Sequence, residues 1–172
     1  RGAASVGLRG HSSLRLPYFA TLSGRITPTL ASSWLVSDDG LTYAFQLRKG
    51  VEFHTTPYFT PTRTFNADDV VFSINRWRVP NHPFHDVSGG RYPYFDSLGL
   101  ASNIAKVERV NGYRVEITLN ERDSAFLANL ASDFAVILSA EYADSPSLAP
   151  RSRAVSYTQP HPAASDPRAP LG

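Results

Sequence analysis

The sequence contains no cysteine and no methionine among its 172 residues. Without cysteine, disulfide bonds and thiolate metal sites are excluded, although the cellular compartment stays open. Without methionine, residue 1 is predicted not to be a natural translation start. No apolar run has the length that a bilayer-crossing helix requires, and no charged-then-apolar signal peptide opens the chain.

Fingerprints of catalysis and of nucleotide binding are also missing. The chain has no G-x-S-x-G nucleophile elbow, no P-loop and no dinucleotide-binding glycine pattern. The Ser-Gly-Gly at residues 88–90 is too short for a phosphate cradle. We therefore predict a protein that is not an enzyme, with no catalytic residue and no cofactor.

Positive charge is concentrated in the two ends of the chain. The net charge is +2, yet residues 25–144 hold 11 basic and 14 acidic residues. Residues 1–24 hold three arginines and no acid, and residues 145–172 hold three arginines and one aspartate. A nucleic-acid groove binder needs a basic folded face, so the sequence predicts no nucleic-acid partner.

Composition divides the chain into three parts. Residues 1–24 show no sustained hydrophobic period, and residues 145–172 hold six of the 13 prolines beside many Ala, Ser and Arg. Such segments bury too little apolar surface to offset chain entropy, so both are predicted to be disordered tails. An alternative reading is that both ends are translated out of frame. Residues 25–144 form the predicted folded segment.

The folded segment mixes strand and helix patterns, which predicts an α/β class. Asp39-Gly40 separates two alternating runs and predicts a hairpin. Asn111-Gly112 predicts a second hairpin, with a type I′ turn. Further helices are expected from Asp123-Ser124 and from Ser139 as a cap, and the apolar run Phe134–Leu138 fits a buried strand or a helix.

The stretch FNADDVVFSINRW has the features of a well-formed helix start. Asn66 is a good N-cap and Asp69 falls at the third helical position, as in a capping box. Asp68 and Asp69 lie where the helix dipole favours negative charge. The paired acids could instead be catalytic or bind metal, but capping explains them more simply. On this reading Asp69→Ala costs about 0.5–2 kcal/mol of stability.

The long segment from Pro80 to Leu100 is rich in aromatic residues and histidine. His82, His85 and Asp86 could hold a metal at one-turn spacing. Prolines at 80 and 83 disfavour a helix there and no third ligand is evident, so structural histidines and no metal site are predicted. Tyr92, Tyr94 and Phe95 could stack on a ligand or form local core.

The segment LASSWLVSDDGLTYAFQLRKGVEFH (Leu30–His54) resembles the signature of the bacterial extracellular solute-binding protein family 5, the peptide-binding components of ABC importers. It supplies Trp34 in a strand, the Asp39-Gly40 turn, the strand Tyr43–Leu47, and Gly50-Val51. The stretches FTPTRTFNADDVVFSINR, NHPFHDVSGGRYPYFDSLGL and DSAFLANLASDFAVILSAEYAD resemble the dipeptide-binding branch, with the Sap-type branch close behind.

This resemblance implies a fragment of a two-lobed periplasmic binding protein of class II type, mainly the accessory subdomain beside lobe I. Its implied role is to capture short peptides in the periplasm, as a monomer, for the permease subunits of an ABC transporter. Tyr92 and Tyr94 are the implied candidates for the cavity wall. The ligand could also be an oligopeptide, a cationic peptide or haem.

The resemblance ends where the composition changes. The family continues past EYAD toward a Gly-Thr-Gly-Pro turn, and this sequence lacks that turn. We therefore expect a truncated, binding-impaired fragment. The alternatives are a stand-alone binding or sensor module and a metal-dependent enzyme acting through His82, His85 and Asp86.

Overall fold

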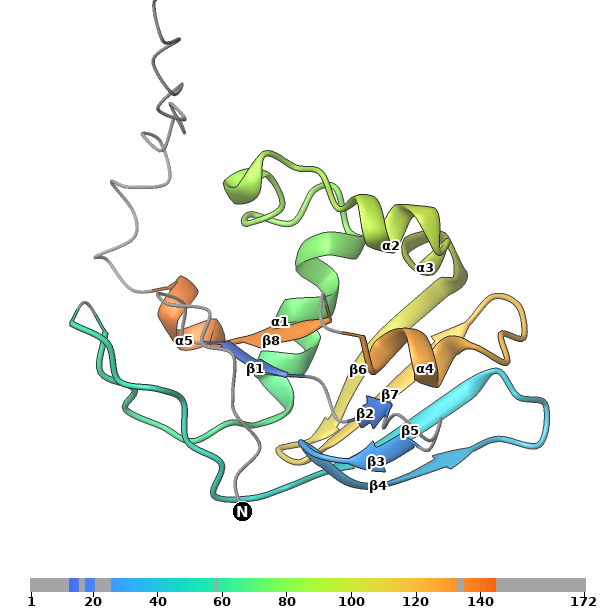
Figure 1. Cartoon of the computed structure of the whole chain (residues 1–172), viewed down its shortest axis with the longest axis horizontal. Helices are drawn as coiled ribbons and strands as arrows, with labels where there is room; N and C mark the ends of the chain where they lie inside the picture. Colours follow the sequence, from blue (N-terminus) through green and yellow to red (C-terminus); the bar gives the residue numbers. More distant parts are fainter. Residues whose placement is uncertain (1–12, 16–17, 21–25, 58, 133–134, 145–172) are drawn as a thin grey trace, which may run out of the picture.

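A computed structural model describes residues 13–15, 18–20, 26–57, 59–132 and 135–144 of the chain. Its centre is an antiparallel sheet of four strands in the order β4-β5-β7-β6, at the lower right of Figure 1. The strands are β4 (Ala31–Val36), β5 (Thr42–Leu47), β6 (Ile104–Asn111) and β7 (Arg114–Leu119). Helices flank this sheet, and the predicted mixed α/β class is confirmed.

Both predicted hairpins form. β4 pairs with β5 across a turn in which the Gly40 N–H donates to Ser37 O at 2.8 Å, and Gly40 has a φ of +70°. β6 pairs with β7 across Asn111-Gly112. The expected type I′ turn is wrong there, because neither Asn111 nor Gly112 has a positive φ. Instead the Asn111 side-chain oxygen accepts the Tyr113 N–H at 2.9 Å. This contact is an Asx turn, in which a side-chain oxygen replaces a backbone acceptor.

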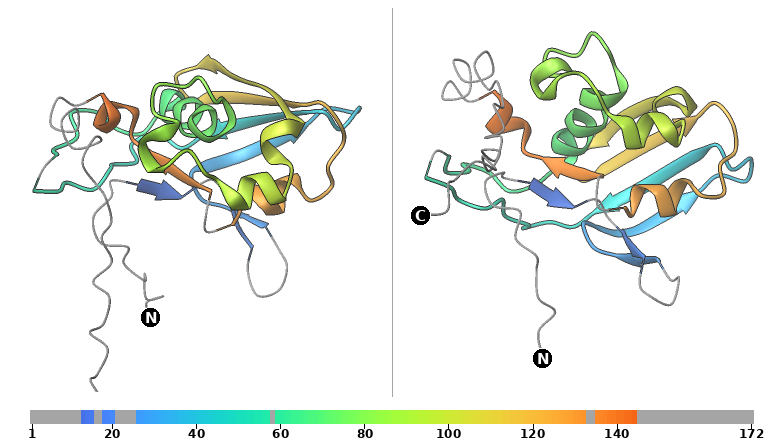
Figure 2. Two further views of the ribbon diagram at one scale, coloured as in Figure 1. Left: turned by 90° about the horizontal axis from the view of Figure 1, so that it is seen from above. Right: turned by 45° about the horizontal axis from the view of Figure 1, so that its top comes forward.

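Helix α1 (Ala67–Arg78) packs on the inner face of the sheet, as the views in Figure 2 show. Its predicted apolar stripe, Val70, Ile74 and Trp77, is buried as expected. Alternate residues of β5 and β7 supply the facing core, because successive side chains of a strand point to opposite faces. These are Tyr43, Phe45, Leu47, Val115, Ile117 and Leu119.

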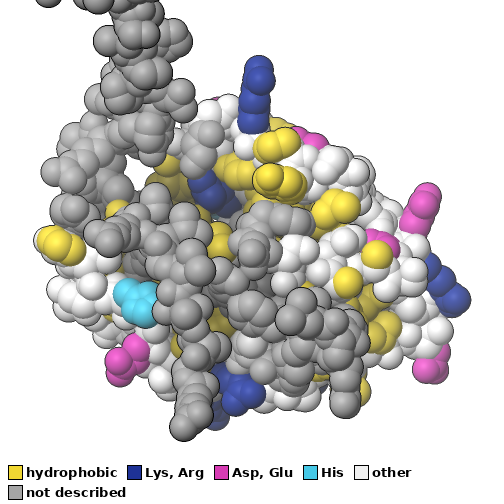
Figure 3. All heavy atoms as spheres, in the orientation of Figure 1, with side chains coloured by type: hydrophobic (Ala, Val, Ile, Leu, Met, Phe, Trp, Pro, Cys, Tyr) yellow, Lys and Arg dark blue, Asp and Glu magenta, His cyan; other side chains and the backbone are white. Residues whose placement is uncertain are grey.

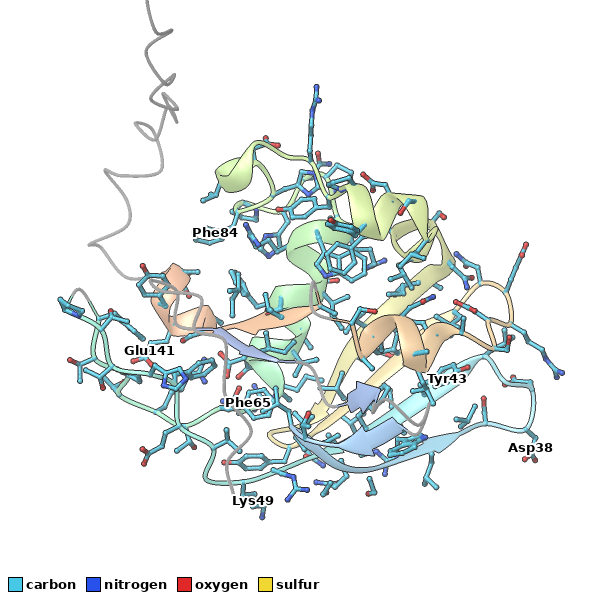
Figure 4. The ribbon with its side chains drawn as sticks, viewed as in Figure 1. Asp38, Tyr43, Lys49, Phe65, Phe84 and Glu141 are labelled. Atoms are coloured by element: carbon cyan, nitrogen blue, oxygen red, sulfur yellow. The ribbon has the colours of Figure 1, made fainter. Side chains whose placement is uncertain are left out.

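Helix α4 (Phe126–Leu130) closes one side of this core. Its Phe126 is fully buried, and the ring centroid lies 4.7 Å from that of Tyr43, which points from β5 toward α4 in Figure 4. The helix begins slightly later than the predicted start at Asp123-Ser124. The Asp123 carboxylate accepts the Ala125 N–H at 2.8 Å, so this aspartate orders the turn before the helix.

The ambiguous apolar run is a strand where the structure describes it. β8 (Val136–Leu138) leads into the short helix α5 (Ala140–Ala143). Ser139 caps α5 as predicted, since its hydroxyl accepts the Tyr142 N–H at 3.2 Å. Phe134, the first residue of the predicted run, lies outside the described residues.

Two short ribbons involve residues that the sequence assigned to an aperiodic tail. β1 (Ser13–Arg15) pairs with β8, and β2 (Tyr18–Ala20) pairs with β3 (Ile26–Pro28). β1 is joined to a strand distant in sequence and β2 to a neighbouring one, while the assignment of residues 1–24 as a tail stays a prediction. The predicted tail at 145–172 lies outside the described residues. Within the described part of the chain, no helix has the length and apolar character needed to cross a bilayer.

Candidate ligand-binding site

The aromatic segment after α1 is folded rather than an open loop. It contains η1 (Asp86–Ser88), α2 (Pro93–Ser97) and α3 (Leu100–Asn103). The turn between η1 and α2 depends on two glycines, since Gly89 and Gly90 have φ of +84° and +63°. A Cβ on Gly90 would lie 2.5 Å from Asp86 Oδ1, so the backbone there is fixed closely against η1.

Tyr92 forms part of the interior of this segment. Its hydroxyl donates to the backbone oxygen of His85 at 2.7 Å, and its ring lies under the Arg76 guanidinium, 5.6 Å from the ring centroid. Burial raises the pKa of Tyr92 above its ordinary value, with Arg76 opposing the shift. Phe95, also part of the predicted cluster, stacks on Trp77 with ring centroids 4.0 Å apart. These contacts connect the segment to the C-terminal half of α1.

Tyr94 lies in a different environment from Tyr92. Its side chain is 64% exposed on α2, and Leu98, four residues later at the end of the helix, is 42% exposed. Residues four apart share one side of a helix, so Tyr94 and Leu98 form a small apolar surface. The structure therefore separates the two predicted site residues into one that supports the segment and one that faces outward. Leu98 was not a sequence candidate, because a leucine after a helix carries no functional pattern.

The two histidines of the segment are both held by backbone groups. His82 Nδ1 accepts the Phe84 N–H at 3.2 Å, and its ring meets Phe72 edge-on with centroids 5.3 Å apart. Burial lowers the pKa of His82, and the nearby positive charges of Arg76 and His85 lower it further. His85 Nδ1 lies 2.8 Å from Arg76 O. A carbonyl oxygen only accepts, so His85 Nδ1 is the donor in this contact.

The structure does not assemble His82, His85 and Asp86 into a metal site. Among the described residues, no group of three or more His, Cys, Asp or Glu side chains could hold a metal ion. Instead, the two histidines of the H-x-x-H-D pattern lie in a turn in which the His85 N–H donates to His82 O at 2.9 Å. The metal-dependent enzyme alternative therefore has no support in the geometry.

Of the paired acids at the start of α1, Asp69 caps the helix as predicted, whereas the Asp68 carboxylate pairs with Arg109. The Asn66 side chain accepts from the Asp68 N–H, and the Asp69 carboxylate accepts from the Asn66 N–H at 3.0 Å, which completes a capping box. Asp69 does more than the sequence indicated. Its fully buried carboxylate is bound at both oxygens by Arg63, at 2.7 and 2.8 Å, and also accepts the Ala140 N–H at 2.9 Å.

A second contact joins the same two parts of the chain. The Glu141 carboxylate of α5 accepts the Thr62 N–H at 3.1 Å and also the Thr62 hydroxyl. Figure 4 shows Glu141 beside the extended segment that precedes α1. Together with Arg63 and Asp69, this contact fixes the entry of α1 against the start of α5, which is an architectural role.

The charges on the visible face are dispersed. In Figure 3, the Lys, Arg, Asp and Glu side chains of the described residues are spread around the rim, with hydrophobic side chains between them. Ion pairs among the described residues join opposite charges on the surface, within β6 for Lys106–Glu108 at 2.6 Å and between β6 and α1 for Arg109–Asp68 at 2.9 Å.

Comparison with known proteins agrees with the resemblance seen in the sequence. The chain matches the family described as bacterial extracellular solute-binding proteins, family 5 Middle, over residues 25–167. The match extends past Asp144 into the segment predicted to be a tail. It also covers every element of the four-stranded sheet and the whole aromatic segment.

Relatives named for different ligands are similar to this chain. Heme-binding protein A of Haemophilus influenzae is 57% identical over 131 residues, which is 76% of this chain and 24% of that protein. The dipeptide-binding protein of Pseudomonas aeruginosa is 54% identical over 129 residues, 75% of this chain and 24% of that protein. The chain thus spans about a quarter of the length of the curated relatives it matches.

Solved structures share the fold. The dipeptide-binding protein from Pseudoalteromonas sp. SM9913, in complex with Met-Leu, gives a TM-score of 0.69 at 46% identity over 77% of this chain and 25% of that chain. HbpA2 from Haemophilus parasuis gives a TM-score of 0.69 at 44% identity over 78% of this chain and 26% of that chain. A match that covers most of the folded segment, with this agreement in fold, shows that the chain belongs to family 5 of the bacterial extracellular solute-binding proteins.

Proposed function

We propose that this chain is part of the substrate-binding component of an ABC-type peptide importer, which captures short peptides in the periplasm for a membrane permease. The observation that carries the proposal is the 54% identity to a dipeptide-binding protein across most of the folded segment. Relatives named as di/tripeptide-binding proteins and as SapA, a periplasmic-binding protein, support the same class. We propose that the protein is a binding protein rather than an enzyme, and that it acts as a monomer.

Within this function, we propose that the outward side of α2 contributes to the ligand cavity. Tyr94 offers an exposed ring and hydroxyl, and Leu98 extends its apolar surface. Such a surface suits the side chains of a short peptide, since aromatic rings combine apolar area with a hydrogen-bonding group. Tyr92 has a supporting role inside the segment instead, because its hydroxyl is already bound to His85 O.

The test is a chimera, because this chain spans only about a quarter of its relatives. Residues 25–144 would replace the matching segment of the dipeptide-binding protein from Pseudoalteromonas sp. SM9913, whose structure contains Met-Leu. Isothermal titration with Met-Leu should give an affinity within about tenfold of that parent, equivalent to about 1.4 kcal/mol. A chimera with the parent's melting temperature and no dipeptide binding would refute the peptide function.

The same chimera assigns the tyrosines. Tyr94→Ala should weaken Met-Leu binding while leaving the melting temperature close to that of the unmodified chimera, because Tyr94 is exposed. Tyr92→Phe removes only the buried hydroxyl and should lower the melting temperature instead. Unchanged affinity in the Tyr94→Ala chimera would dismiss α2 as part of the cavity.

Haem is the second candidate ligand, favoured by the 57% identity to a haem-binding protein. His85 has the arrangement that haem and metal ligands use, in which Nδ1 donates to a backbone oxygen and orients Nε2. His82 has the opposite tautomer, since its Nδ1 accepts. Haemin titration of the chimera, with His85→Gln and His82→Gln, decides between the candidates. A Soret shift lost only in His85→Gln would favour haem, and no shift would dismiss it.

A further inference from the structure

Strand β8 has two edges, and they are satisfied in different ways. One edge pairs with β1, where Ile137 lies opposite Leu14. On the other edge, the Leu138 N–H donates to Ser73 Oγ at 2.8 Å and the Ala140 N–H donates to Asp69 Oδ1 at 2.9 Å. The Leu138 carbonyl oxygen also faces Ser73 Oγ, at 3.3 Å. Helix α1 therefore occupies the place that a neighbouring strand would take.

The spacing of the two side chains along α1 matches the spacing of the N–H groups along the edge of β8. Asp69 and Ser73 are four residues apart on α1, so they lie on one face and are separated by about 6 Å along the helix axis. N–H groups on one edge of a strand recur every second residue, about 6.6 Å apart. Two hydrogen-bonding side chains at this helical spacing thus meet two successive outward N–H groups of an extended chain.

The contacts are buried and specific. Asp69 has no exposed surface and Ser73 is 4% exposed. The Ser73 hydroxyl donates to Asp69 O at 2.6 Å, which leaves its oxygen free to accept from Leu138. Capping of α1 requires Asp69 but gives no reason for Ser73, which lies past the first turn. A role at the β8 edge accounts for both residues.

Strand β8 also lacks the other common protection of a strand edge. The edge strand β6 of the main sheet exposes Lys106, Glu108 and Arg109, and charged side chains of this kind discourage pairing with another chain. β8 is Val-Ile-Leu and carries no charge. An antiparallel pair of two such strands would place no like charges opposite each other. No charge repulsion in the sequence of β8 therefore discourages pairing with β8 of a second copy of the chain.

We propose that Asp69 and Ser73 form an edge lock, defined by their bonds to Ala140 and Leu138, which prevents β8 from pairing with β8 of a second copy of the chain. Through these bonds, α1 takes the position that a further strand would occupy beside β8. It limits extension of the β1–β8 ribbon to its β1 side, and it suppresses self-association through an apolar strand.

Amide hydrogen exchange, measured by NMR on the full chain, tests the lock residue by residue. The Leu138 and Ala140 amides should be protected together with Ile137, although only Ile137 faces β1. Ser73→Ala should speed exchange at Leu138 by at least about tenfold relative to Ala140, and Asp69→Ala, which removes the acceptor for Ala140, should do the reverse. If Leu138 and Ala140 exchange as fast as exposed amides in the unmodified folded chain, the lock does not exist.

Sedimentation equilibrium tests the consequence. The double variant Asp69→Ala/Ser73→Ala should associate more strongly with rising concentration than the unmodified chain. Asp68→Ala is the matched control, because Asp68 is in the same helical turn and its carboxylate binds the exposed Arg109 of β6 rather than β8, and it should sediment like the unmodified chain. A folded double variant with rapidly exchanging Leu138 and Ala140 amides and unchanged sedimentation would overturn the role against self-association.

Discussion

Replacing Asp69 by alanine would measure what the buried contact at the start of α1 contributes to folding. The carboxylate has no exposed surface and accepts from Arg63, Asn66 and Ala140. Its loss removes a helix cap, worth about 0.5–2 kcal/mol. It also leaves the Arg63 side chain, which is 31% exposed, without its partner. Breaking a buried ion pair from one side costs about 3–5 kcal/mol, and because Arg63 stays partly solvated we expect a loss near the lower end of that range, still larger than that of a cap alone.

Urea denaturation followed by far-UV circular dichroism and by the fluorescence of buried Trp77 gives the free energy of unfolding. Asp68→Ala is the control, since Asp68 and its partner Arg109 are 45% and 51% exposed in their side chains. Exposed pairs contribute about 0–1 kcal/mol. Equal losses of less than about 1 kcal/mol in both variants would show that the Arg63–Asp69 contact adds nothing, and would refute the reasoning.

Three further predictions concern the aromatic segment. Gly90→Ala should lower the melting temperature, because its φ of +63° disfavours a side chain and the new Cβ would approach Asp86 Oδ1. Phe95→Ala removes the ring stacked on Trp77 and should cost about 3–5 kcal/mol in urea denaturation, with a change in tryptophan fluorescence. Because the folded chain holds the pKa of His82 below its ordinary value of 6.5, stability should be full above that pH and fall as the pH drops below it; His82→Phe should lack this decrease in urea midpoint.

Local signals in the sequence identified the elements that depend on neighbouring residues. Asn66 and Asp69 predicted the capping box because a cap is decided within four positions. Asp39-Gly40 predicted a hairpin for the same reason, and so did Asn111-Gly112, although its turn type was wrong. Each of these features needs only contacts between residues that are close along the chain.

Features that join distant segments were not predictable from such signals. The pairing of β5 with β7 brings Phe45 opposite Val115. No local pattern in the sequence indicates which strands of different hairpins pair with each other. The link from Asp69 to Ala140 spans the fold in the same way, which is why capping explained only part of that residue. Tyr92 and Tyr94 look equivalent in sequence, and they differ only in the fold, where the Tyr92 hydroxyl binds His85 O and the Tyr94 side chain is exposed.

The pairing of β1 with β8 has a consequence for the order in which the chain folds. Ser13 lies opposite Leu138 in this ribbon, so nearly the whole described chain is enclosed between the two strands. Closing so long a loop costs entropy before any contact offsets it. The two hairpins and α1 depend mainly on contacts between residues close in sequence, so they can form first. The Asp69 and Ser73 side chains of α1 then provide the acceptors that bind β8. β1 and β8 should therefore join late, as the step that completes the fold rather than the step that begins it.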